Sequence, residues 1–157
     1  MKLKIKDSGF TVIELLVVVT TVALLATIGL SSFQGYMLRS KTAEAPIALG
    51  KIVSGEIEYF HKNQAFLEAG PINIPPVPRG PTTVNFDLDP RWKEIGFAMG
   101  PTMYFGYQVA SVSATQINCD AMADLTGDGI SSLFRRTVVA NGSDISAGGL
   151  YIFDELE

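Results

Sequence analysis

The chain has 157 residues, which is enough for one modest domain and little else. Its formal net charge of −4 argues against a whole-protein attraction to nucleic acid. The single cysteine, Cys119, excludes an intramolecular disulfide and is interpreted as a small buried hydrophobe. Hydrophobic residues are 47% of the chain and charged residues 18%, but the apolar residues crowd the N-terminal end.

The N-terminal end combines a short basic stretch with a long apolar one. Residues 1–9 hold three lysines and one aspartate, and Phe10 to Leu30 carry a single ionisable group, Glu14. About 20 apolar residues in a helix cross a hydrocarbon core of about 30 Å. Because the lysines precede the apolar run and no basic residue follows until Arg39, we expect a cytoplasmic N-terminus.

Two simpler interpretations of this apolar segment are possible, and the presence of Glu14 argues against both. A secretory signal peptide has an apolar stretch of roughly 7–15 residues followed by a small-residue cleavage site, whereas this run is longer and continues into a helix-like sequence. A plain membrane anchor is the second alternative. Neither accounts for a carboxylate in hydrocarbon, which costs roughly 2.5–3.5 kcal/mol on insertion scales and so indicates a function.

The sequence GFTVIELLVV, from Gly9 to Val18, resembles the cleavage and methylation signature of type IV prepilins and secretion pseudopilins. The resemblance covers residues 1–35 and combines a basic leader, glycine before phenylalanine, a glutamate four residues later and the apolar run. It implies that a prepilin peptidase cuts between Gly9 and Phe10 and methylates the new amine of Phe10. It also implies that Glu14 meets the terminal amine of a neighbouring subunit in a filament.

Elementary electrostatics agrees with the implied pairing of Glu14 with the terminal amine of a neighbouring subunit. Removing residues 1–9 changes the side-chain net charge from −4 to −6 and exposes an amine four residues before Glu14. In lipid or in a filament core an ion pair is poorly screened, and an unpaired carboxylate is unfavourable. Glu14 is therefore expected to select the axial stagger between subunits.

We predict one long helix from about Phe10 to about Phe66. Residues 10–35 form its transmembrane, all-apolar half, and residues 36–68 form an amphipathic half that packs on a C-terminal domain. The apolar stripe of that half is expected to consist of Ile47, Leu49, Ile52, Val53, Ile57, Phe60 and Phe66. The other faces are expected to carry Arg39, Lys41, Glu44, Lys51, Glu56, Glu58 and Lys62.

Helix-breaking residues interrupt the pattern. Pro46 removes a backbone hydrogen bond and predicts a kink nearby. Many members of the resembled family carry a proline where this chain has Ser31, and here Gly29, Ser32 and Gly35 could supply flexibility instead. Whether this segment melts on assembly is left open.

Residues 69–157 are predicted to form a globular β domain. A loop rich in proline and glycine spans Ala69 to Thr83, and Trp92 is expected to be an aromatic packing anchor. Strands are predicted over 103–112, 115–125, 131–140 and 150–153, with alternate residues of the second strand facing inward. These inward residues are Ile117, Cys119, Ala121 and Ala123. The fold class is therefore α+β, a long helix on a roughly four-stranded antiparallel sheet, as the pilin resemblance also implies.

The sequence from Asp124 to Gly129 is a partial match to a calcium loop, with Asp124, Thr126 and Asp128 as oxygen ligands. The position where such a loop needs a bidentate glutamate is Arg135, although Asp120 lies close enough to contribute. The alternative is a turn between strands, which Gly-Asp-Gly favours. Calcium is the one cofactor that the sequence suggests.

No other constellation of catalytic residues is apparent in the sequence. His61 is the single histidine, which excludes a histidine-based metal cluster, and no phosphate loop or nucleophile elbow is present. Arg135 and Arg136 are adjacent, so on a strand they point to opposite faces and form no basic patch. A nucleic-acid partner is therefore retained as a hypothesis for the assembled filament alone.

The sequence therefore predicts a structural subunit of a type IV pilus and not an enzyme. The expected partners are further copies in a helical filament, minor pilins, the prepilin peptidase, the inner-membrane assembly platform and the inner membrane itself. Adhesion, twitching motility or DNA uptake would be the roles of an extracellular pilus. A pseudopilin of type II secretion, in a periplasmic pseudopilus, and a minor pilin are the alternatives, and the lack of a cysteine pair departs from many major pilins. A membrane-tethered periplasmic enzyme or sensor is the alternative from another class.

Overall fold

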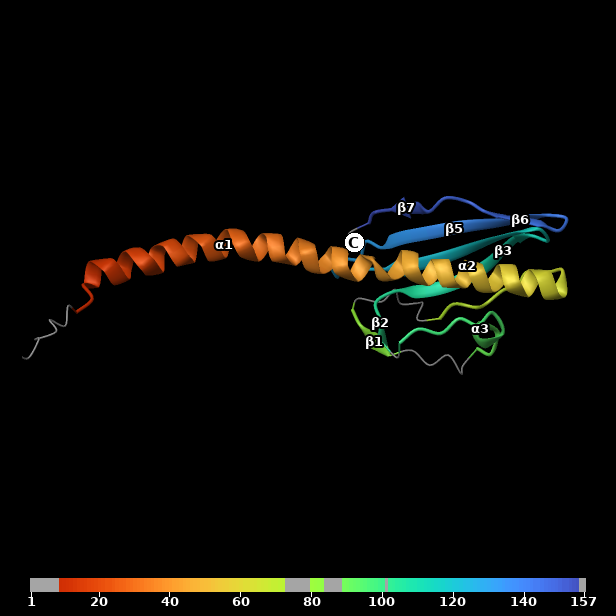
Figure 1. Cartoon of the computed structure of the whole chain (residues 1–157), viewed down its shortest axis with the longest axis horizontal. Helices are drawn as coiled ribbons and strands as arrows, with labels where there is room; N and C mark the ends of the chain where they lie inside the picture. The colour runs from red at the N-terminus through yellow and green to blue at the C-terminus, as the bar shows by residue number, and fades with distance from the viewer. Residues whose placement is uncertain (1–8, 73–79, 84–88, 101, 156–157) are drawn as a thin grey trace, which may run out of the picture. The chain divides into compact units, whose positions relative to one another are not determined.

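A computed structural model describes residues 9–72, 80–83, 89–100 and 102–155, apart from the side chain of Ser31. The chain divides into two compact units, Met1–Met37 and Leu38–Glu157, which are treated separately below. The second unit is called the globular unit. Figure 1 labels the helices and strands in chain order.

Helix α1 (Val12–Thr42) continues unbroken through Gly29 and Gly35. Its long apolar side chains up to Met37 are exposed, because this unit holds no second element to cover them. In the described part of the chain, this helical segment is the one that is long and apolar enough to cross a membrane.

A break at Ala43 separates α1 from α2 (Glu44–Asn63). Pro46 has no N–H to donate to the carbonyl of Thr42, so the helical hydrogen-bond ladder is interrupted there, as the predicted kink requires. Helix α2 ends three residues earlier than predicted, at a left-handed Gln64 (φ 57°) whose N–H bonds the carbonyl of Phe60 at 2.7 Å.

One face of α2 packs on the sheet. Of the predicted stripe, Leu49, Ile52, Val53 and Phe60 are buried, whereas Ile57 is half-buried and Phe66 lies beyond the helix. Ile47 is 60% exposed, whereas Glu56, which we expected on a polar face, is completely buried. Position 56 follows Ile52 by four residues and precedes Phe60 by four, so helical spacing places it on the buried stripe whatever its charge. The buried residues of α2 are Ala45, Ala48, Leu49, Ile52, Val53, Glu56 and Phe60.

The main sheet is antiparallel and has five strands, which is one more than predicted. Its strands are β3 (Gly106–Ser113), β4 (Gln116–Ala123), β5 (Ser132–Asn141), β6 (Asp144–Ala147) and β7 (Tyr151–Phe153). The order is β3-β4-β5-β6, and β7 also pairs with β5, at the end opposite to β6. The sequence pattern missed β6 because its four residues contain one large apolar side chain, Ile145.

Smaller elements flank the sheet. Strands β1 (Thr82–Thr83) and β2 (Thr102–Met103) form a separate antiparallel pair, and α3 (Arg91–Glu94) is a single turn. The predicted strand over 103–112 is divided, because Tyr104 and Phe105 leave the ladder and donate their N–H groups to the carboxylate of Glu44 in α2. Most of the predicted proline-rich loop, residues 73–79, lies outside the described residues.

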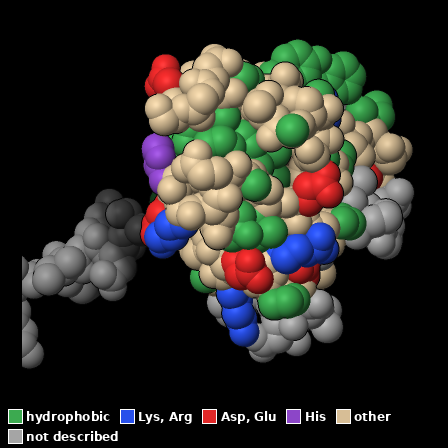
Figure 2. Space-filling view, turned by 90° about the vertical axis from the view of Figure 1, so that its right-hand side faces the viewer, with side chains coloured by type: hydrophobic (Ala, Val, Ile, Leu, Met, Phe, Trp, Pro, Cys, Tyr) green, Lys and Arg blue, Asp and Glu red, His purple; other side chains and the backbone are tan. Residues whose placement is uncertain are grey.

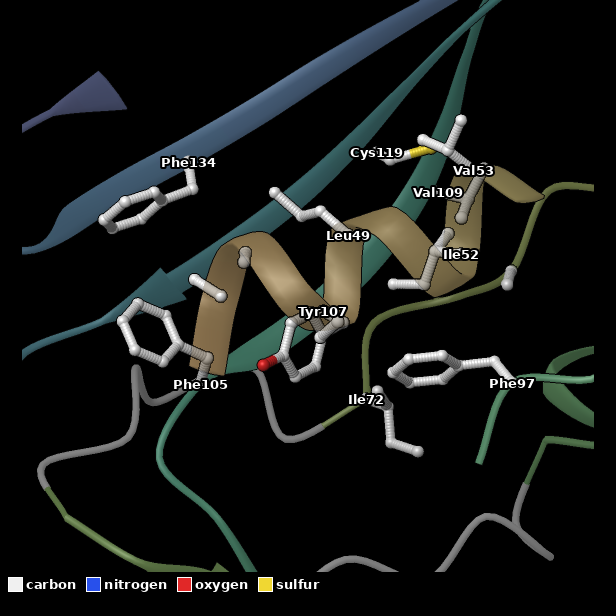
Figure 3. Close-up of a cluster of buried hydrophobic side chains, with 14 of the residues drawn as sticks. Leu49, Ile52, Val53, Ile72, Phe97, Phe105, Tyr107, Val109, Cys119 and Phe134 are labelled. Carbon is white, nitrogen blue, oxygen red and sulfur yellow. The ribbon is translucent and has the colours of Figure 1, made fainter. Parts of the chain in front are cut away.

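The core lies between α2, the inner face of the sheet and the segment that carries α3 (Figure 3). The four inward residues predicted for β4 are all buried, and Trp92 is fully buried against Phe97, with ring centroids 5.2 Å apart. Phe97 in turn meets the edge of Tyr107 at 5.6 Å. The α+β fold class is confirmed for this unit. Its largest fully buried apolar side chains include Trp92, Tyr107, Phe97, Phe105, Phe134, Leu49 and Ile52.

Candidate functional site

The predicted processing site lies just before α1. Gly9 and Phe10 are both exposed and non-helical, and Phe10 is 74% exposed. An exposed, non-helical peptide bond is one that a peptidase can bind. The basic leader, residues 1–8, lies outside the described residues.

Glu14 has an intrachain role that the sequence interpretation overlooked. Thr11 is the residue before the first residue of α1, and its N–H and hydroxyl donate to Glu14 Oε2 at 2.9 and 2.6 Å. The N–H of Glu14 reaches back toward Thr11 Oγ1 at 3.3 Å. Threonine followed three residues later by glutamate is the capping-box pattern, and this signal was available in the sequence.

The capping box uses one oxygen of the carboxylate. Among the described residues, Glu14 Oε1 accepts no hydrogen bond, and the side chains around it are apolar and exposed. The cap fixes the carboxylate at the first turn of α1 while one oxygen remains available to a donor from elsewhere.

The hydroxyl groups along α1 are satisfied within the helix. Thr20, Thr21 and Thr27 each donate to a backbone carbonyl three or four residues earlier at 2.9 Å. These bonds add no unpaired donor to the surface. The exposed surface of α1 up to Leu30 is therefore apolar apart from Glu14 near its start and these internally bonded hydroxyl groups.

The predicted calcium loop is organised as a turn by its own carboxylates. Asp124 is 2% exposed, and its two oxygens accept the N–H groups of Gly127 and Gly129 at 2.6 and 3.0 Å. Asp128 accepts from the N–H of Ile130 at 2.8 Å. Both glycines have positive φ, which explains their placement. Calcium binding by Asp124, Thr126 and Asp128 stays a prediction.

Asp120, the candidate additional ligand of that loop, is occupied elsewhere. It lies opposite Arg135 across β4 and β5, and the arginine donates two hydrogen bonds to its oxygens at 2.6 and 2.8 Å. The side chain of Asp120 is 2% exposed and that of Arg135 is 38% exposed, so this is a charge-assisted pair with one buried partner. Across the described residues, no group of three or more His, Cys, Asp or Glu side chains is arranged to hold a metal ion.

Two acidic residues of α2 were also misjudged from the sequence. Glu44 accepts the hydroxyl of Tyr107 at 2.8 Å in addition to the two backbone N–H groups noted above, so it fixes α2 to the start of β3. Glu56 is buried beside the inner face of the sheet, where its Oε2 accepts the N–H of Leu67 at 3.1 Å. Its Oε1 has no hydrogen-bond partner among the described residues, and burial raises the pKa of Glu56 to about 7.

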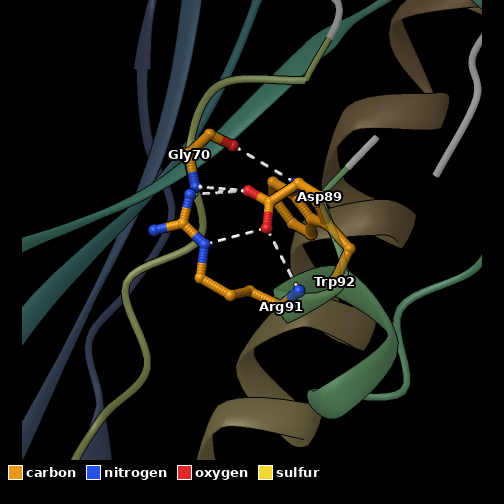
Figure 4. A network of polar contacts seen from close by, with 4 residues as sticks. All are labelled: Gly70, Asp89, Arg91 and Trp92. Carbon is orange, nitrogen blue, oxygen red and sulfur yellow. Dashed lines mark hydrogen bonds and ion pairs between the residues drawn. The ribbon is translucent and has the colours of Figure 1, made fainter. Parts of the chain in front are cut away.

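A polar network fastens the segment after α2 to α3 (Figure 4). The carboxylate of Asp89 accepts from the Arg91 side chain at 2.8 Å and from the N–H of Gly70 at 3.2 Å. The indole of Trp92 donates to the carbonyl of Gly70 at 3.2 Å. The Arg91 guanidinium holds the pKa of Asp89 below its usual range. These groups satisfy one another, so the network is structural.

Charged groups on the face drawn in Figure 2 are mixed in sign, with Lys and Arg side chains next to Asp and Glu. His61, for which the sequence predicted no site, is exposed on α2. Grooves along α2 and beside Arg91 are among the hollows that the described residues of the globular unit line. The strongest candidate site is therefore the N-terminal segment, Gly9 to Glu14, with the apolar helix that follows.

Comparison with known proteins adds no relative, because no family model, curated protein or solved structure matches this chain.

Proposed function

We propose that the chain is a prepilin-like structural subunit and not an enzyme. In this proposal a peptidase removes residues 1–9, Phe10 becomes the methylated N-terminus, and the apolar helix holds the subunit in the inner membrane until it enters a helical filament. One observation supports it above the others. A fully exposed apolar helix carries a single carboxylate, Glu14, one turn from the predicted new terminus, with one oxygen unused among the described residues.

The energetics favour association of that helix with copies of itself. Its apolar side chains are exposed from Val12 to Met37, and burying such surface is worth roughly 25 cal/mol per Å² outside lipid. That gain is non-directional, so it does not by itself choose a register. A carboxylate in the resulting core is stable only beside a donor or a cation. The amine of Phe10 of an adjoining copy is the cation that cleavage would create.

The capping box makes a sharp test possible, because Glu14 has two separable properties. Glu14→Gln keeps a capping acceptor but removes the charge, whereas Thr11→Ala removes the cap but keeps the charge. We expect Glu14→Gln to abolish filaments in cells and Thr11→Ala to leave their yield within about twofold, since a lost cap costs only about 1 kcal/mol.

Electron microscopy of sheared surface fibres, with mass spectrometry of the mature N-terminus, gives the readout. Equal losses in the two variants would reduce Glu14 to a helix cap, and a mature chain that begins elsewhere than Phe10 would refute the processing step. The same micrographs separate the alternatives: surface fibres indicate a pilus, whereas lost protein secretion without fibres indicates a pseudopilus.

A further inference from the structure

The globular unit carries an open groove of about 740 Å³ along the exposed side of α2. Gly50 and Ser54 have small or absent side chains, and Gly50 has open space around it, so a chain can approach the helix backbone there. The exposed side chain of Ile47 adds an apolar contact, and Lys51 and Arg136 supply positive charge.

The two cations of the groove lack an acidic partner. The ammonium of Lys51 contacts Met99 Sδ at 3.6 Å, and Arg136 Nε reaches the carbonyl of Gly148 at 3.5 Å. Within the described residues, neither forms an ion pair, whereas Glu58, which also lines the groove, is paired with Lys62. The groove therefore offers two cations with which an acidic segment of another molecule can pair.

A complementary feature lies at the C-terminal end of the described chain, on the part of the sheet beside the groove. Strand β7 pairs with β5 through one of its sides, and its three side chains are exposed: Tyr151 (57%), Ile152 (42%) and Phe153 (54%). Asp154 and Glu155 follow directly and are also exposed. An exposed, apolar edge strand is a ready site for association, and this one carries no proline or lysine.

The opposite edge of the sheet is already covered. The N–H of Val109 on β3 donates to the carbonyl of Ala69, and Ile72 exchanges two backbone hydrogen bonds with Tyr107. The exposed β7 edge is thus the side of the sheet at which another molecule can dock. Its sequence, three apolar residues and then two acids, complements a groove that offers the exposed apolar side chains of Ile47 and Ala98 together with two cations.

We propose that the α2 groove of one copy receives the β7 end, Tyr151 to Glu155, of a second copy. Asp154 and Glu155 lie against Lys51 and Arg136, and the apolar residues of β7 lie against Ile47. This inference rests on the proposed filament, and it names the surface through which adjacent globular units meet. The groove and the β7 end are different surfaces, so the contact is head-to-tail, and with an axial displacement between copies it repeats without closing.

Two separate estimates, one along the helix and one along the sheet, give the axial displacement between neighbouring copies that this contact requires. Glu155 contacts Thr42 through its carbonyl at 3.2 Å, and Lys51 lies nine residues further along the helical segment, or about 13 Å at 1.5 Å per residue. Along the sheet, Phe153 is level with Leu133, and Arg136 lies four residues beyond the level of Asp154, which is about 13 Å at 3.3 Å per residue. A copy displaced by about 13 Å therefore brings its acidic end level with the groove of its neighbour.

Cysteine cross-linking in cells that assemble the filament tests the contact. With Lys51→Cys and Asp154→Cys in one chain, mild oxidation should give a ladder of covalent multimers. Neither single variant should give one. The native Cys119 contributes no background, because it is fully buried and burial raises the pKa of its thiol. Lys51→Cys with Asp144→Cys is the matched control, since Asp144 is an exposed acid at the far end of the sheet.

Charge exchange gives a second measurement. Lys51→Glu should reduce filament yield by roughly two- to fivefold, as expected for a partly exposed pair, and adding Asp154→Lys should restore it. Suppose that filaments form at normal yield, but Lys51→Cys combined with Asp154→Cys gives no more multimer than the control pair. That result would overturn this contact and leave the proposed function intact. Absence of filaments from the unmodified chain would overturn both.

Discussion

Replacing Glu56 with glutamine tests the most unusual buried group of the globular unit. The carboxyl is completely buried, one oxygen bonds the N–H of Leu67 and the other has no partner among the described residues. Glutamine has nearly the same shape and keeps an acceptor for Leu67, but it cannot ionise. The substitution therefore isolates the effect of the buried charge.

The direction and size of the expected change in stability follow from the raised pKa of Glu56. Burial raises the pKa of Glu56 from 4.5 to about 7, so between these pH values the folded chain holds a proton that the unfolded chain has lost. The free energy of unfolding should thus fall as pH rises from about 4.5 to about 7 and then level off. At about 1.4 kcal/mol per pH unit, the total loss is about 3 kcal/mol.

The Glu56→Gln variant should lack this pH-dependent loss. We expect it to be more stable than the natural chain by up to about 3 kcal/mol at pH 8 and to differ little at pH 4.5, where the natural carboxyl is neutral. Urea unfolding of the full chain in detergent micelles measures this, with Trp92, the single and fully buried tryptophan, as the fluorescent probe.

Glu58→Gln is the matched control, because Glu58 lies on the same helix but is exposed and paired with Lys62. Its effect on the free energy of unfolding should be small at every pH, because an exposed ion pair contributes little to stability. If the natural chain and Glu56→Gln show the same pH slope between 5 and 7, then Glu56 is not a buried proton-binding group and the reasoning fails.

Three further predictions concern the same unit. Gly55→Ala would place a methyl group in steric overlap with the carbonyl oxygen of Ile95 and should lower the free energy of unfolding by about 1–3 kcal/mol, whereas Gly50→Ala, with open space around it, should raise it slightly. Arg135→Ala removes the charged partner of a buried carboxylate that keeps one hydrogen bond, from Gln108 at 3.2 Å, so urea unfolding should show a loss of about 1–3 kcal/mol; a loss below about 0.5 kcal/mol would mean that the pair contributes little to stability. Cys119 should resist a maleimide in the folded chain and react in urea, and rapid labelling of the folded chain would contradict its burial.

The regular patterns of the chain were visible in its sequence. The composition of Phe10 to Leu30 determined an exposed apolar helix, and alternation along β4 determined which of its side chains face inward. The break between α1 and α2 near Pro46 agrees with the sequence, because a missing N–H acts within one turn of the same helix. The Thr11–Glu14 cap was equally local, and its signature was present but not used.

The tertiary structure decided the features that depend on contacts between residues far apart in the sequence. Glu56 is buried because α2 turns that stripe toward the sheet, and the Asp120–Arg135 pair exists because β4 and β5 meet in one register. The placement of β7 beside β5, which leaves an apolar edge exposed, depends on a short β6 that no periodicity revealed. Composition and period act within one element, whereas burial of a charge and pairing across strands are set by the contacts between elements.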